Sequence, residues 1–204
     1  MIALDQADDG LWTVTLDRPD KANSLTREML EELLRIAREA HAARALVLTG
    51  RGRVFSAGAD LDAARAGLAT SPLWEELSAA IAALPGLTIA ALNGTLAGGA
   101  MGMALACDVR LAVPGAKFFY PVMKLGYLPQ PSDPARMAAL IGPARTRLLL
   151  MGGQKIDAET ALAYGLIDRV CEPPALLDEA RAIAADTLSA DPDLAARIKR
   201  MCTP

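Results

Sequence analysis

Short apolar runs alternate with amphipathic stretches along this chain, which predicts strands and helices in turn. Residues 12–16 alternate apolar and polar side chains with the period of a half-buried strand. The runs 45–49, 88–92 and 109–113 are apolar or β-branched, as in buried strands. Helical patterns cover 26–37, 62–84, 99–106, 144–151, 157–165, 175–188 and 193–201, and a further helix opens at 132–134. Pro72 interrupts the pattern at 62–84. This alternation predicts an α/β layered fold.

Size, charge and cysteine content narrow the class of protein. A chain of 204 residues suits one domain, or one and a fraction. The net charge of −3 gives no basic footprint for a nucleic acid. The three cysteines (Cys107, Cys171 and Cys202) show no metal-ligand spacing and are too few for a disulfide scaffold. We therefore expect no metal and no nucleic-acid partner, and a reducing cytoplasm fits the cysteine usage.

One segment is long enough to cross a membrane. Residues 86–107 contain no charged side chain. However, Asn93-Gly94 and Gly98-Gly99 interrupt the segment, and a strand pattern precedes a helical one. We therefore predict the buried centre of a globular domain rather than a membrane span. The first residues lack the basic and then apolar layout of a signal peptide.

Two glycine-bearing turns carry the strongest chemical signal. The segment Phe55–Leu61 follows the strand at 45–49, and the segment Asn93–Ala100 follows the strand at 88–92 and leads into a helical stretch. A helix that begins directly after such a turn leaves free backbone N–H groups at its start. Two of these turns on neighbouring strands can aim their N–H groups at one oxygen atom. The pattern therefore predicts an oxyanion hole made of main chain.

These turns belong to a set of segments that resembles the crotonase (enoyl-CoA hydratase/isomerase) superfamily. Either turn alone would be a weak signal, but five segments occur in the right order and at the right spacing. They are 17–25 (DRPDKANSL), 55–61 (FSAGADL), 93–100 (NGTLAGGA), 107–110 (CDVR) and 165–170 (GLIDRV). The resemblance extends over nearly the whole chain.

The resemblance implies a fold, a ligand and an assembly. It implies an α/β spiral of repeated β-β-α units over residues 1–190, with residues 191–204 as the start of a truncated C-terminal helical region. It also implies a homotrimer or hexamer. Because that helical region makes the subunit contacts in the family, the sequence leaves the oligomeric state open.

The same resemblance implies that the site binds an acyl-CoA thioester. Its carbonyl oxygen would lie between the backbone N–H groups of Ala59 and Gly99, where enolate charge is stabilised. No separate cofactor is expected, because coenzyme A enters as part of the substrate. The positions expected to contact the substrate are Lys21, Ala22, Ala57, Asp60, Leu61, Gly98 and Tyr120. For Asp60 the residues also suggest a structural role, in which it holds its own loop.

The two glutamates that handle water in the hydratases of this family are missing. The matching positions hold Gly102 and Val122, and neither can transfer a proton. Hydration needs one group to activate water and one to protonate the α-carbon. The sequence therefore keeps the binding half of a hydratase and lacks its catalytic half. Literal hydratase activity is not expected.

Several residues are candidates for the acid–base role of these glutamates. Asp133 lies in the loop that borders the acyl pocket in the family, although an Asp before Pro at a helix start is typical of an N-cap. Tyr120 is expected to be pocket wall or hydrogen-bond donor. Glu75 is expected on a solvated helix face. His41, the only histidine, has no partner motif for a Ser–His–Asp hydrolase.

Two main hypotheses follow. The first is a lyase or isomerase of the crotonase group that performs an atypical enolate reaction on a CoA thioester. Decarboxylation fits, since it forms an enolate without a base, and so does slow isomerisation with Asp133. The alternative is a protein that binds acyl-CoA without converting it. A truncated remnant that cannot assemble is a third possibility. The residues favour the enzyme and leave the acyl chain and the reaction open.

Overall fold

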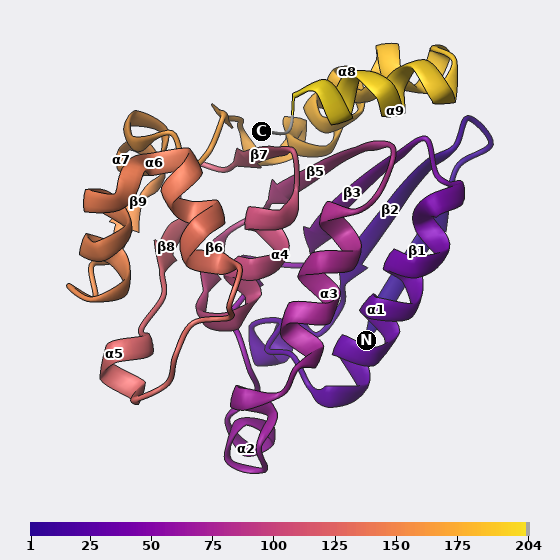
Figure 1. Cartoon of the computed structure of the whole chain (residues 1–204). Helices are drawn as coiled ribbons and strands as arrows, with labels where there is room; N and C mark the ends of the chain where they lie inside the picture. The colour runs from indigo at the N-terminus through magenta and orange to yellow at the C-terminus, as the bar shows by residue number, and fades with distance from the viewer. Residues whose placement is uncertain (203–204) are drawn as a thin grey trace.

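The computed structural model describes residues 1–202 and shows two β-sheets with helices packed around them (Figure 1). The strands of the larger sheet, in spatial order, are β1 (Ile2–Gln6), β2 (Leu11–Leu16), β3 (Ala45–Gly50), β5 (Leu87–Leu92), β7 (Val109–Ala112) and β10 (Arg169–Val170). Those of the smaller sheet are β4 (Val54–Ser56), β6 (Thr95–Ala97), β8 (Lys117–Phe119) and β9 (Ile156–Asp157).

A β-β-α unit recurs along the chain and links the two sheets. β3, β5 and β7 lie parallel in the larger sheet, and each leads within a few residues into β4, β6 or β8 of the smaller one. A helix follows each of these pairs. The helices are α1 (Arg27–Glu39), α2 (Leu61–Arg65), α3 (Leu73–Ala82), α4 (Met101–Ala106), α5 (Val122–Leu125), α6 (Asp133–Leu150), α7 (Ala158–Tyr164), α8 (Leu176–Ser189) and α9 (Pro192–Met201). The predicted α/β spiral is confirmed.

Local sequence explains where the helices begin and break. Thr26 caps α1 as predicted, because its Oγ1 accepts a hydrogen bond from Met29 N at 3.3 Å. Pro72 separates α2 from α3, in agreement with the expected interruption. Gly142, with a φ of 79°, breaks α6 into the two helical parts that the sequence predicts. The single turn of α5 was not predicted, because it is too short to show a period.

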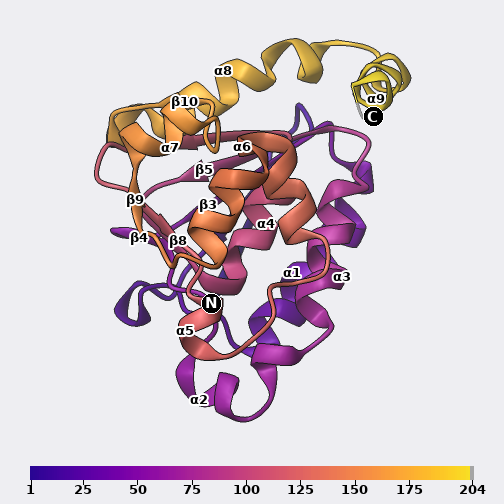
Figure 2. The ribbon, with the colours of Figure 1, turned by 60° about the vertical axis from the view of Figure 1, so that its left-hand side comes forward.

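The core lies between the larger sheet and the helices. The predicted apolar stripe of α1 is buried, and α1 packs against α3, which packs against α4 (Figure 1). α8 contacts β3, β5 and β7 and runs along the larger sheet (Figure 2).

The uncharged segment 86–107 folds as β5, β6, a 3₁₀ turn at Gly98–Ala100 and α4. Each of these elements is short. β5 is an interior strand of the larger sheet, and β6 is an interior strand of the smaller one. Within residues 1–202, no helix has both the length and the apolar character needed to cross a membrane.

Arg110 on β7 is a buried charge that ties three parts of the chain together. Its side chain is only 4% exposed and donates to the carbonyl oxygens of Leu166 at 3.0 Å and Cys107 at 2.6 Å. It also pairs with Asp168 at 3.2 Å. A guanidinium can satisfy all of these acceptors at once because its donors form a planar fork.

Replacing Arg110 by methionine is expected to lower the free energy of unfolding by about 3 kcal/mol, because each buried polar group left without a partner costs about 1–3 kcal/mol. Chemical denaturation followed by circular dichroism measures this loss. Arg65→Met is the control, since Arg65 is 77% exposed and its ion pair lies on the surface. Equal stability of the two variants would contradict the structural role of Arg110.

Candidate active site

The two glycine-bearing turns meet in space because they follow neighbouring strands. β4 and β6 run parallel, and each leads directly into its turn. Gly58 and Gly98 have φ angles of 89° and 58°, in the left-handed region that favours glycine. A Cβ atom on Gly58 would lie 2.9 Å from the Ala97 carbonyl oxygen, and one on Gly98 would lie 3.6 Å from Gly58 Cα. Glycine at both positions therefore allows the two backbones to touch.

This contact places the amides of Ala59 and Gly99 at the same cavity, because both residues line it. Nearby amides of the first turn form hydrogen bonds within the protein. Ala57 N donates to Ala22 O at 3.0 Å, and Asp60 N donates to Leu25 O at 2.9 Å. Within residues 1–202, the amide of Ala59 itself donates to no backbone carbonyl. Gly99 lies in the first turn of a 3₁₀ helix, where amides have no partner inside the helix. The two amides are therefore available to a ligand oxygen.

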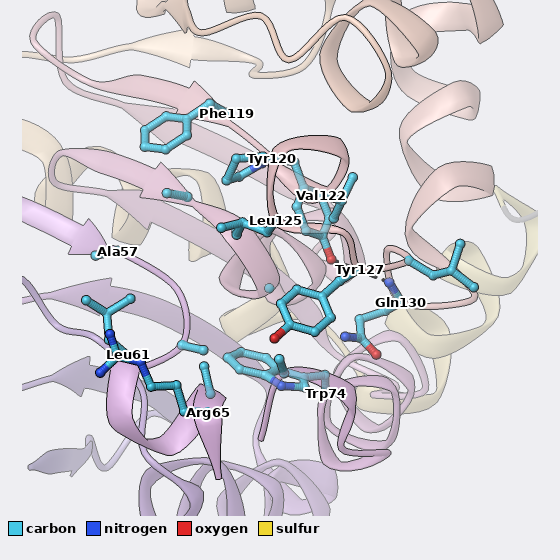
Figure 3. Close-up of a pocket in the computed structure, with 18 residues that line it drawn as sticks. Ala57, Leu61, Arg65, Trp74, Phe119, Tyr120, Val122, Leu125, Tyr127 and Gln130 are labelled. Atoms are coloured by element: carbon cyan, nitrogen blue, oxygen red, sulfur yellow. Dashed lines mark hydrogen bonds between the residues drawn. The ribbon is translucent and has the colours of Figure 1, made fainter. Parts of the chain in front are cut away.

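The cavity has a volume of about 390 Å³, which is in the range of small-molecule sites. Its walls come from α2, α3, β6, β8 and the segment that follows β8. Figure 3 shows Leu61 and Arg65 on one side, with Trp74, Tyr127 and Gln130 facing them. The lining residues are Ala57, Ala59, Leu61, Ala64, Arg65, Ala69, Trp74, Ala97, Gly98, Gly99, Phe119, Tyr120, Pro121, Val122, Leu125, Tyr127, Leu128 and Gln130. Arg65 is the one charged side chain among them.

The structure brings some of the predicted substrate contacts into this cavity and leaves others outside its lining. Ala57, Leu61, Gly98 and Tyr120 line it, whereas Lys21, Ala22 and Asp60 do not. Lys21 is exposed. The Ala22 carbonyl accepts a hydrogen bond from Ala57 N, so Ala22 supports the backbone of the first turn.

Asp60 holds the start of α2. Its Oδ1 accepts from the amides of Asp62 at 3.1 Å and Ala63 at 3.3 Å, and its Oδ2 accepts from Arg18 at 2.8 Å. The hydrogen bond from the Arg18 guanidinium has the largest effect and the one from the Ala63 amide the next largest, and both hold the pKa of Asp60 below its usual range. Asp60 is therefore ionised at neutral pH and fixes the loop that presents the Ala59 amide.

Sequence reasoning did not identify Trp74 as part of the site. Its indole lies against Gly99, so that a Cβ atom on Gly99 would lie 3.2 Å from Trp74 Cδ2. Trp74 Nε1 donates to Leu68 O at 2.8 Å, which fixes the ring. Trp74 thus holds the second turn in place and forms a wall of the cavity. The sequence places Trp74 in the helical pattern at 62–84 but carries no signal that it faces the cavity.

The N-cap interpretation of Asp133 is wrong. Asp133 is the first residue of α6, Ser132 is the cap position, and no side chain of the cap residue bonds back to the helix. Glu75 on α3 replaces the cap, because its Oε2 accepts from Ser132 N at 3.1 Å and from Ser132 Oγ at 3.0 Å. The expectation of a solvated Glu75 is therefore also wrong. A capping group from another helix leaves the Asp133 side chain free to turn inward.

Asp133 fills the space beside Gly102. A Cβ atom on Gly102 would lie 2.9 Å from Asp133 Oδ1, so the carboxyl group occupies the place into which a side chain at position 102 would project. Asp133 is fully buried. Its Oδ2 accepts from Tyr120 Oη at 3.0 Å, and its Oδ1 has no hydrogen-bond partner within residues 1–202. Thus a carboxyl group stands next to the first missing glutamate position after all.

Burial determines the protonation of this pair. Loss of water raises the pKa of Asp133 to about 7, although the hydrogen bond from Tyr120 and the charge of Arg136 act in the opposite direction. Burial, together with the Asp133 charge, raises the pKa of Tyr120 well above its usual range. Tyr120 therefore stays protonated, while Asp133 changes its charge near neutral pH.

The other position expected to lack a glutamate is Val122. Val122 is buried and lines the cavity at the start of α5. Lys124, two residues later, is exposed. Within residues 1–202, no group of three or more His, Cys, Asp or Glu side chains is arranged to hold a metal ion.

Comparison with known proteins identifies the family to which this chain belongs. The enoyl-CoA hydratase/isomerase family matches residues 6–203. A protein of Mycobacterium tuberculosis described as a probable enoyl-CoA hydratase is 35% identical over 188 residues, which cover 91% of this chain and 75% of that protein. A carnitinyl-CoA dehydratase of Citrobacter koseri is 36% identical over 202 residues, covering 92% of this chain and 75% of that protein.

The fold gives the same assignment. The crystal structure of an enoyl-CoA hydratase from Bacillus anthracis superposes with a TM-score of 0.90 at 32% identity, and the match covers 98% of this chain and 81% of that one. The chain therefore belongs to the enoyl-CoA hydratase/isomerase family within the crotonase superfamily.

Proposed function

We propose that this chain binds an acyl-CoA thioester and stabilises the enolate formed from it. The carbonyl oxygen of the thioester lies between the amides of Ala59 and Gly99. The observation that carries this proposal is that Ala59 and Gly99 line the same cavity, and the Ala59 amide donates to no backbone carbonyl within residues 1–202. Fixed amide dipoles at a developing negative charge stabilise it without reorganisation. Coenzyme A is part of the substrate, so the proposal needs no separate cofactor.

The cavity wall supports an acyl ligand. Its lining is mainly apolar, with Leu61, Trp74, Phe119, Leu125 and Leu128 among the larger side chains. Such a surface buries an acyl chain and keeps water away from the enolate. The favoured chemistry is therefore an enolate reaction other than hydration, as a lyase or isomerase.

A second candidate function is binding without conversion. The observation in its favour is that no carboxylate lines the cavity. Val122 occupies one expected glutamate position there, and the carboxyl group of Asp133 is fully buried. A protein of this kind would hold acyl-CoA at the same amides and release it unchanged.

A panel of CoA thioesters tests the proposal. The panel includes saturated, 2-enoyl, 3-enoyl, 3-hydroxy and malonyl-type acyl groups, with affinity measured by calorimetry and products by mass spectrometry after chromatography. We expect binding of at least one member and conversion to a product that names the reaction class. Binding without any product favours the second candidate, and absence of binding to every thioester overturns both.

The variant Ala59→Pro isolates the amide contribution. It removes the N–H group of Ala59 and no internal backbone hydrogen bond, because that amide donates to no carbonyl within residues 1–202. We expect turnover to fall by about 10²–10³-fold, as for the loss of one oxyanion-hole donor. Unchanged turnover in a variant with wild-type circular dichroism would place the thioester oxygen elsewhere.

A further inference from the structure

The pair formed by Tyr120 and Asp133 connects the cavity with a buried carboxyl group. Tyr120 lines the cavity next to Val122, and its Oη donates to Asp133 Oδ2 at 3.0 Å. The same Oη accepts from the amide of Gln130 at 3.4 Å, and Gln130 also lines the cavity (Figure 3). Asp133 does not line the cavity, and Tyr120 is the lining residue that donates a hydrogen bond to it.

The burial of this pair is unusual for a structural contact. Asp133 is fully buried, and one of its oxygens has no partner within residues 1–202. A buried polar atom without a hydrogen bond costs free energy that a plain wall of the cavity would not require. A buried group kept at such a cost is a candidate for a role in the chemistry of the site.

We propose that Tyr120 and Asp133 form the proton-transfer pair of this site, in which Tyr120 contacts the α-carbon of the thioester and Asp133 takes up the proton through Tyr120. This inference rests on the proposed binding of an acyl-CoA thioester. Tyr120 is the catalytic residue of the pair, and Asp133 is a positioning residue that also stores the proton.

The step balances in both directions. The α-carbon loses a proton to Tyr120 Oη, and the C–H electron pair becomes the enolate held by Ala59 and Gly99. Tyr120 passes its own proton to Asp133 Oδ2 at the same time, so the tyrosine stays neutral and the aspartate becomes a neutral acid. In reverse, Asp133 returns the proton through Tyr120 to the α-carbon. Exchange of these O–H protons with water replaces the α-proton by one from the solvent.

The surroundings of the pair agree with this assignment. The charged groups near Asp133 are Glu75 on α3, which caps α6 through Ser132, and Arg136 on α6, which donates to Ser78 Oγ at 2.9 Å. α4 presents Gly102 to the carboxyl group and carries no titratable side chain over Met101–Ala106. The raised pKa of Tyr120 keeps it a neutral carrier, and the pKa of Asp133 near 7 lets the carboxyl group gain and lose a proton at neutral pH.

Exchange of the α-protons of butyryl-CoA in deuterated water tests the pair. The reaction needs no leaving group and no added nucleophile, and mass spectrometry measures the deuterium gained. We expect the wild-type chain to exchange. Tyr120→Phe and Asp133→Asn are expected to lose about 10²–10⁴-fold in rate, as for the loss of a general acid or base. Both substitutions nearly preserve the size of the side chain, so affinity for butyryl-CoA should change by less than about tenfold.

The pH profile separates proton transfer from a purely structural role. Asp133 accepts the proton as a carboxylate, so the wild-type exchange rate should fall as the pH falls through about 7. The residual rate of Asp133→Asn should not change in that range. Tyr164→Phe and Asp178→Asn are controls outside the cavity lining and are expected to behave as wild type.

The outcomes separate this inference from the proposed function. Binding of butyryl-CoA with no exchange by the wild type overturns the proton-transfer pair and leaves acyl-CoA binding standing. Exchange that survives in either folded variant, or a wild-type rate that does not depend on pH near 7, also overturns it. Absence of binding overturns the proposed function and the pair together.

Discussion

Replacing Gly99 by valine is expected to reduce turnover of any CoA thioester by at least about 10²–10³-fold, the effect of losing one oxyanion-hole donor. A Cβ atom at this position would lie 3.2 Å from two carbons and 3.3 Å from a third in the Trp74 ring. Valine adds two methyl groups beyond that Cβ atom, and the ring they meet is held by its hydrogen bond to Leu68 at 2.8 Å. Either the turn moves and the Gly99 N–H group no longer points at the ligand oxygen, or the indole moves and changes the wall of the cavity. Both responses remove the ligand site.

Calorimetry and product analysis measure the Gly99→Val effect, with Gly115→Val as the matched control. A Cβ atom on Gly115 meets no atom within 4 Å, and its φ is not in the left-handed region. We expect the control to bind and turn over thioesters as the wild type does. Retention of both properties in folded Gly99→Val would show that the second turn does not hold the thioester oxygen.

The sequence predicts the long elements of this fold better than the short ones. The strands at 45–49 and 88–92 and the helix after Thr26 are long enough to display a period, and the structure has them as β3, β5 and α1. β4, β6 and β8 have three residues each, so they show no period, and the smaller sheet was not predicted. Their pairing depends on contacts between residues far apart in the chain.

The site shows the same division. The two glycine-bearing turns could be recognised locally, because a strand, a turn and a helix follow one another within each segment. The buried position of the Asp133 side chain could not be predicted locally. It depends on Glu75, which reaches α6 from α3, and on the space that Gly102 leaves for the carboxyl group. The sequence therefore predicts a glutamate missing at position 102, and only the structure places the carboxyl group of Asp133 beside that position.

Hydration of crotonyl-CoA by this chain is expected to be slower than in an enoyl-CoA hydratase by at least about 10²-fold, and by about 10⁴-fold or more where neither of the two acid–base groups is replaced, because each supplies about 10²–10⁴-fold. Gly102 and Val122 cannot supply them. The Tyr120–Asp133 pair contributes one proton-transfer group at most, so it cannot both activate water and protonate the α-carbon. Loss of the ultraviolet absorbance of the conjugated thioester measures the rate. A rate equal to that of an enoyl-CoA hydratase would contradict this account.

A variant that restores both carboxylates should regain hydration only if Asp133 is also removed. A glutamate at position 102 would begin 2.9 Å from Asp133 Oδ1 and place two carboxyl groups in one buried space, where both cannot ionise. We therefore expect the triple variant Gly102→Glu, Val122→Glu, Asp133→Ala to hydrate crotonyl-CoA at least about 10²-fold faster than its matched control, in which glutamine replaces both glutamates. The two triple variants have the same size and differ only in the ability to transfer protons. Equal rates in the two would mean that the cavity does not present positions 102 and 122 to the double bond.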